Sequence, residues 1–192
     1  EAVITIGPAR FTIIFSRMIR VEYSQNAQFE DRSSQTFLNR KQPVPSFDVT
    51  DDEKLLTIRT EHLELMWHKN TRFSKDTLHI HVKNTDTTWC FGDNDEQNLK
   101  GTIRTLDSIN GSSPLLPGLF SRSGMSVIND SHSLVFDDNG ELHPREQGDY
   151  QDYWFFGYGY EFHDCLREYC KVSGEIPLIP RPLLGNWWSR YW

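Results

Sequence analysis

Two stretches of this sequence carry large apolar side chains at every second position, and this restricts the fold more than any other feature. Leu63, Leu65 and Trp67 form the first set. Leu78, Ile80 and Val82 form the second, in which histidines occupy the alternate positions. Side chains of a strand point alternately to opposite faces, so this period indicates half-buried antiparallel strands. Thr60-Glu61, just before the first set, predicts a hairpin turn.

Further short runs of β-branched and aromatic residues continue this pattern on both sides of the two stretches. We expect strands at 3–6, 11–15, 18–23, 125–128, 133–136 and 153–158. The segment 137–140, Asp-Asp-Asn-Gly, is a turn signal. Short strands separated by turns favour an antiparallel β-sandwich over a βαβ sheet.

The period changes once, near the end of the chain. Apolar residues at 162, 165, 166, 169 and 172 lie on one face of a helix, and Gly174 stands where a helix C′ glycine belongs. The prolines at 177, 180 and 182 exclude further helix and predict an extended connector. We interpret the aromatic segment 186–192 as a buried strand of a second unit, so the chain is expected to be the front part of a longer protein or to pair with another chain.

A long segment without periodicity, at about 92–123, separates the two groups of strands. It is rich in Gly, Asp, Asn, Ser and Pro, which is typical of a functional loop. We expect it to be ordered, because it contains seven apolar residues that could anchor it to the domain: Leu99, Ile103, Leu106, Leu115, Leu116, Leu119 and Phe120.

Composition removes several classes of function. The chain has 20 Lys and Arg against 27 Asp and Glu, a formal charge of -7, which argues against a nucleic-acid partner. An aromatic share of 13% argues against disorder, and no apolar run is long enough to span a membrane. The three cysteines, Cys90, Cys165 and Cys170, fit no disulfide framework; reduced thiols favour a cytoplasmic location, with secretion left open.

No motif identifies a reaction by spacing alone. His79 and His81 have the spacing of a zinc pair but lack a signalled third ligand, and 93–96 lacks the glycine and closing glutamate of an EF-hand loop. Gly157 and Gly159 are not followed by the third glycine of a dinucleotide fingerprint. The sequence therefore predicts neither a metal nor a cofactor.

Several blocks in the second half of the chain nevertheless resemble glycoside hydrolase family 31, in the same order. Residues 98–107 (NLKGTIRTLD), followed by Asn110-Gly111, are similar to the family pattern NLGGTxRTLD. Lys100 departs from this pattern, which has glycine at that position. The remaining blocks are 116–124, 134–137, 152–159, 177–181 and 185–192.

The resemblance implies a galactose-mutarotase-like β-sandwich over residues 1–175, with the loop at about 92–123 reaching the active site. It implies that 176–192 are the linker and first strand of a (β/α)8 barrel whose remainder is absent. Family members are mostly retaining exo-acting α-glucosidases, which use two carboxyl groups on later barrel strands. The resemblance thus places no catalytic residue in this chain, whose partners would be the barrel and an oligosaccharide. A homo-oligomer is compatible with the sequence.

Three residues are assigned roles through the same resemblance. Asp107 is expected to contact the leaving-group sugar from the long loop, and Arg104 to support that loop. Tyr191 lies at the end of the first barrel strand, where side chains face the site, and is expected to form a wall of the −1 sugar pocket.

Two other functions remain open on the residues themselves. A free-standing carbohydrate-binding module would end at the sandwich and expose an aromatic platform, which the aromatic ending argues against. An aldose-epimerase-like enzyme on the same fold would need its own Glu and His pair on the concave sheet. The scattered histidines do not form such a pattern.

Overall fold

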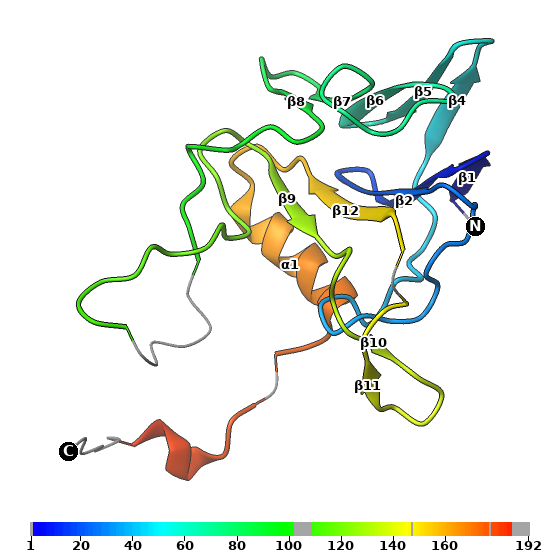
Figure 1. The fold of residues 1–192 in the computed structure, drawn as a ribbon. Helices are drawn as coiled ribbons and strands as arrows, with labels where there is room; N and C mark the ends of the chain where they lie inside the picture. The colour runs from blue at the N-terminus through cyan, green and yellow to red at the C-terminus, as the bar shows by residue number, and fades with distance from the viewer. Residues whose placement is uncertain (1, 102–108, 147, 177, 186–192) are drawn as a thin grey trace.

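The computed structural model describes residues 2–101, 109–146, 148–176 and 178–185. Two antiparallel five-stranded sheets dominate it (Figure 1). The first has the order β1-β2-β3-β12-β9, and the second has the order β4-β5-β6-β7-β8. The predicted antiparallel β-sandwich with one α-helix is therefore confirmed.

The strands of the first sheet are β1 (Val3–Ile6), β2 (Ala9–Phe15), β3 (Met18–Ser24), β9 (Ser126–Asn129) and β12 (Tyr150–Phe156). Those of the second are β4 (Phe47–Asp51), β5 (Leu55–Thr60), β6 (Leu63–His68), β7 (Leu78–Val82) and β8 (Thr88–Cys90). A two-stranded hairpin, β10 (Val135–Phe136) and β11 (Leu142–His143), lies apart from both sheets.

The main hydrophobic core fills the space between the two sheets. In β6 and β7 the apolar positions of the period-two pattern are buried, and the alternate positions are less buried. Trp67 packs against Phe11 of the opposite sheet, with ring centroids 5.5 Å apart. The alternation read from the sequence therefore has the expected cause: one face of each strand contributes to the core.

A second core covers the other face of the first sheet. The helix α1 (Phe162–Ser173) places Cys165 and Val172 against Trp154 and Phe156 of β12. Figure 1 shows this helix lying beside β9 and β12. Phe37, from the long β3–β4 connection, stacks on Trp154 with a centroid separation of 3.8 Å. Consequently β3 and β12 are buried on both faces, unlike the half-buried strands of the second sheet.

The helix ends as the sequence predicts. Gly174 has a φ of 98°, and its N–H donates to the carbonyl of Cys170. After it comes a short 3-10 helix, η1 (Arg181–Leu184). The expectation that the prolines exclude further helix is therefore wrong for this segment, because a proline is tolerated in the first turn of a helix. No helix among the described residues is both long and apolar enough to cross a membrane.

Candidate functional site

The long loop leaves the sandwich through a narrow, hydrogen-bonded base. Residues 98 and 121 form an isolated antiparallel bridge, and the N–H of Leu99 donates to the carbonyl of Phe120 over 2.9 Å. The N–H of Gly101 donates to the carbonyl of Leu116 over 2.7 Å. The two ends of the loop are thus joined much as in a short β-ladder. Residues 109–115, which are described, extend away from the sheets (Figure 1).

Asn98 holds this base together through its side chain. Its Oδ1 accepts the N–H groups of Lys100 at 2.9 Å and Gly118 at 2.7 Å, while its Nδ2 donates to the carbonyl of Gly118 at 2.9 Å. The residue is 9% exposed, so these bonds are largely shielded from water. We call the arrangement of Asn98, Lys100, Gly101 and Gly118 the loop clasp.

Gly118 is required for the close approach of the two chain segments in the loop clasp. A Cβ at this position would lie 2.6 Å from the carbonyl oxygen of Lys100 and 2.9 Å from the N atom of Gly101. Both neighbours are backbone atoms, which cannot rotate away as the end of a side chain could. Any larger residue at position 118 would therefore force the two chain segments of the loop clasp apart.

Lys100, the departure from the family pattern, adopts the conformation that glycine favours. Its φ is 66°, in the left-handed region where a Cβ is crowded by the following carbonyl. The backbone geometry thus remains accessible with lysine, at a cost of about 1 kcal/mol per such residue.

Replacing Lys100 by glycine should therefore stabilise the fold slightly. We expect the Lys100→Gly variant to gain about 0.5–1 kcal/mol in the free energy of unfolding, part of the strain being offset by the greater freedom of glycine in the unfolded chain. Urea titration followed by tryptophan fluorescence measures this difference. A loss of stability would show that the lysine side chain contributes contacts that outweigh the strain.

The second end of the loop is anchored to three other elements. Thr87 Oγ1 donates to the carbonyl of Ser123 at 2.8 Å, and Tyr160 OH donates to that of Arg122 at 3.1 Å. Phe120 packs on Phe162 at the start of α1, with centroids 5.2 Å apart. These contacts fix the loop base relative to the second sheet and the helix.

The expectation that seven apolar residues anchor the loop is only partly right. Leu119 and Phe120 pack against the second core. Leu99, Leu115 and Leu116 are instead 46–56% exposed, and Ile103 and Leu106 lie outside the described residues. At the loop base, hydrogen bonds of Asn98 and of the backbone take the place of the expected apolar contacts. The two chain segments approach each other too closely there for large side chains to fit between them.

The three residues assigned through the family resemblance fall outside the described part of the chain. Arg104 and Asp107 belong to the segment 102–108, and Tyr191 to the segment 186–192. The loop clasp includes Gly101, the last described residue before the first of these segments.

A large ion cluster, which the sequence pattern did not indicate, lies buried under the β3–β4 connection. Asp152 accepts hydrogen bonds from Arg20 Nε at 2.9 Å, Arg20 Nη2 at 2.7 Å and Arg145 Nη1 at 2.9 Å. Arg145 also donates to Asp130, which Arg40 contacts at 3.1 Å. These residues are separated by up to 132 positions, so no local signal could have grouped them.

Burial and charge act in opposite directions on the carboxyl groups of this cluster. Burial alone would raise the pKa of Asp152, but the charge and hydrogen bonds of Arg20, together with the charge of Arg145, lower that pKa to about 2. For Glu22 the effect of burial prevails over the attraction of Arg20, and its pKa is raised. More than one arginine of the cluster offsets the effect of burial on Asp152, so this carboxyl group stays ionised.

A cavity of about 360 Å³ opens beside this cluster. It lies between the end of β3 and the start of β12 and is lined partly by Glu22, Arg145 and Asp152. The charged groups of these three residues already bond to one another or to neighbouring arginines and acids. We therefore assign the cluster a structural role, holding the β3–β4 connection on the first sheet.

The two histidines with zinc-pair spacing have separate partners. His79 Nε2 lies 2.8 Å from the carbonyl oxygen of Lys75, and His81 Nδ1 lies 3.0 Å from Thr88 Oγ1. A different group, Asp137, Glu141 and His143, brings three metal-ligand atoms within 4.8 Å of one another. The sequence predicts the turn at 137–140 but carries no signal that these three side chains meet around it.

Comparison with known proteins extends the description of the fold. No family model matches the sequence, and no curated protein matches it. Among solved structures, a GH31 dextranase from Flavobacterium johnsoniae, in complex with isomaltotriose, matches 93% of this chain with a TM-score of 0.55 and 12% identity. The same dextranase in complex with glucose matches 90%, with a TM-score of 0.53 and 12% identity.

These matches involve only part of the dextranase. The chain spans 27% and 26% of the length of the two structures, about a quarter in each case. At this identity the likeness concerns the path of the backbone and not the chemistry of a site. The chain therefore has the β-sandwich fold found in one part of a GH31 dextranase.

Proposed function

We propose that this chain is the N-terminal β-sandwich and barrel entrance of a family 31 glycoside hydrolase, a retaining exo-acting α-glucosidase. The observation that carries the proposal is the fold shared with a GH31 dextranase over 93% of the chain. The ordered sequence blocks support it independently, since they depend on residue identity and not on the path of the backbone. Hydrolysis itself would be performed by the barrel, because the resemblance places both catalytic carboxyl groups there.

The loop clasp supports a role for the loop at the substrate pocket. A sugar-contacting side chain must be held in place to contribute to binding, and the clasp rigidly fixes one end of the segment that contains Asp107. We propose that Asp107 accepts hydrogen bonds from the leaving-group sugar and that Arg104 supports the loop. Tyr191 is proposed as a wall of the −1 pocket.

The segment after α1 supports the proposed junction with a barrel. Four of its apolar side chains are strongly exposed, and Leu178 is 99% exposed. Several strongly exposed aliphatic residues within one short segment are typical of a surface that another part of a protein covers. In the proposal the barrel covers Ile176, Leu178, Ile179 and Leu184.

Substitution of Asp107 in the complete protein tests the proposed sugar contact. We expect Asp107→Ala to lower kcat/KM for an α-linked glucose disaccharide by about 10- to 100-fold, because a hydrogen bond to a charged group contributes about 1.5–3 kcal/mol. With an aryl α-glucoside, whose leaving group offers no such hydroxyls, the loss should be much smaller. Steady-state kinetics on both substrates measure the effect.

A matched control distinguishes the loss of the proposed sugar contact from the loss of one negative charge. Asp86 is exposed on the β7–β8 turn, and Asp86→Ala should leave both substrates unaffected. Equal losses on the two substrates in Asp107→Ala would contradict the proposed leaving-group contact. If the complete wild-type protein hydrolysed neither substrate, the α-glucosidase proposal itself would fail.

A further inference from the structure

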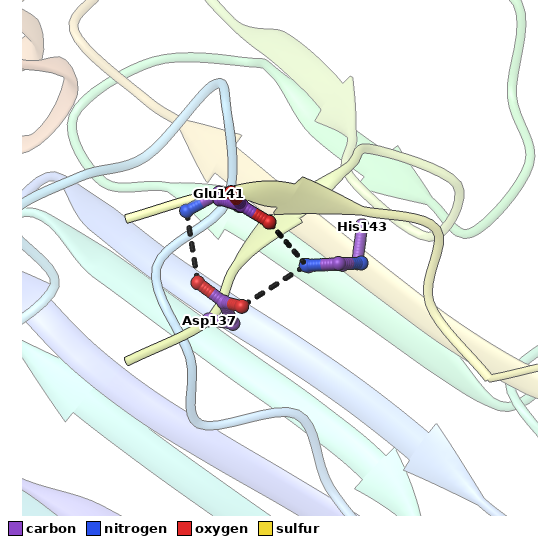
Figure 2. A group of neighbouring side chains, drawn as sticks. All are labelled: Asp137, Glu141 and His143. Carbon is purple, nitrogen blue, oxygen red and sulfur yellow. Dashed lines mark hydrogen bonds and ion pairs between the residues drawn. The ribbon is translucent and has the colours of Figure 1, made fainter. Parts of the chain in front are cut away.

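Three side chains with metal-binding atoms converge on the β10–β11 hairpin. His143 Nε2 lies 3.0 Å from Asp137 Oδ2 and 4.0 Å from Glu141 Oε2. Figure 2 shows the imidazole and both carboxylates pointing toward one another from the two sides of the hairpin. We call Asp137, Glu141 and His143 the hairpin triad.

The backbone of the hairpin determines this convergence. Glu141 directly precedes β11 and His143 is its second residue, so the two side chains leave the chain on the same side. Asp137 directly follows β10, and its N–H donates to the carbonyl of Glu141 at 2.9 Å, which places it opposite the other two. The turn between them closes at Gly140, whose φ is 81°.

Asp137 is held with one oxygen directed toward the other two residues. Its Oδ1 accepts the N–H of Asn139 at 2.9 Å and that of Glu141 at 2.8 Å. Oδ2 is therefore left to face His143. The side chain of Asp137 is already held in this orientation before an ion binds.

The composition of the triad sets the class of ion that it can hold. One imidazole nitrogen and two carboxylate oxygens form a donor set suited to zinc and to other divalent transition metals. Ca²⁺ and Mg²⁺ prefer oxygen donors throughout, so the imidazole disfavours both. Ligand atoms 3.0 and 4.0 Å apart can share an ion bound at about 2.0–2.2 Å after small side-chain rotations.

We propose that the hairpin triad is a binding site for a divalent transition-metal ion, with Zn²⁺ as the favoured ion. Metal bonds to Asp137, Glu141 and His143 would replace the His143–Asp137 hydrogen bond and connect the ends of β10 and β11. A two-stranded hairpin of two-residue strands has little stability of its own, so such a connection would order it. Water would complete the coordination, because all three side chains are accessible to solvent.

Isothermal titration of the metal-free chain with ZnCl2, together with Co²⁺ absorption spectra, tests this proposal. We expect one ion to bind per chain, and His143→Ala to weaken binding by more than about 100-fold, since loss of outer partners of a metal ligand alone costs about 10- to 100-fold. Glu141→Gln and Asp137→Asn, which retain the size of each side chain, should each weaken binding. Circular dichroism of each variant verifies that the fold is intact.

The double variant His79→Ala/His81→Ala is the matched control. It removes two imidazoles with zinc-pair spacing from the surface of β7 while leaving the hairpin triad intact, so it should bind the ion as the wild-type chain does. Loss of binding in this control, unchanged binding in His143→Ala, or no saturable binding by the wild-type chain would each overturn the proposal. Because the readout is ion binding, the result does not depend on the proposed glycosidase activity.

Discussion

Replacing Asp152 by alanine should lower the free energy of unfolding by about 3–5 kcal/mol, the cost of removing one partner from a buried ion pair. The substitution leaves Arg20 and Arg145 beside each other, with side chains only 5% and 3% exposed. Neither guanidinium could recover its lost hydrogen bonds from bulk water without opening the β3–β4 connection. Urea titration of the variant and of the wild-type chain measures the difference.

Asp149→Ala provides the matched control. Asp149 lies only three residues away and also pairs with an arginine, Arg72, but both side chains are about half exposed. A solvent-exposed ion pair contributes about 0–1 kcal/mol, so this substitution should cost far less. Equal effects of the two substitutions would contradict the structural role assigned to the buried cluster.

The same carboxyl group makes stability depend on pH in a defined range. The native pKa of Asp152, about 2, lies below its ordinary value of 3.8, so the native state retains the charge where the unfolded chain has lost it. The stabilisation is therefore complete above the ordinary value and declines as the pH falls from about 4 toward 2. The Asp152→Ala variant should lose this part of the acid dependence.

Replacing Gly118 by alanine should have the largest effect on the loop. The added Cβ would meet the backbone of Lys100 and Gly101, so the loop clasp would have to open and the hydrogen bonds of Asn98 would be lost. Overpacking of this kind costs about 1–3 kcal/mol. In the complete protein, displacement of the segment that contains Asp107 should lower kcat/KM for an α-linked glucose disaccharide by about 100-fold.

Gly101→Ala tests whether this effect comes from the specific close approach. Gly101 belongs to the same clasp, but a Cβ there would lie 3.4 Å from the Cα of Gly118, an ordinary contact. This variant should therefore retain most of the stability. Limited proteolysis gives a readout independent of activity: cleavage within the loop should accelerate in Gly118→Ala and remain near the wild-type rate in Gly101→Ala.

The strands that sequence patterns missed are mostly exposed or have only two or three residues. β4 is an edge strand with four of its five residues exposed, and β8 and β11 have only three and two residues. Such segments are strands because a neighbour supplies hydrogen bonds, not because of their own composition. The turn at 137–140 was predicted, but the strand that follows it, β11, was not.

The burial of charged residues in the first sheet could not be predicted from the sequence for a related reason. Arg20 and Glu22 alternate with Ile19 and Val21, a pattern typical of one apolar and one solvated face. Both charged residues are instead buried, because the β3–β4 connection and Arg145 cover that face. Alternation identifies two different faces but does not establish that the polar face meets water.

The sequence by itself determined the local structure of this protein: the period-two strands, the hairpin turn within one residue of Thr60-Glu61, and the α-helix that ends before Gly174. Each of these depends on residues a few positions apart, whose spacing is visible in the chain. Tertiary structure alone decided the loop clasp, the buried ion cluster and the partners of the histidines. The clasp joins residues 20 positions apart and the cluster residues up to 132 apart, so their contacts exist only after the sheets have formed.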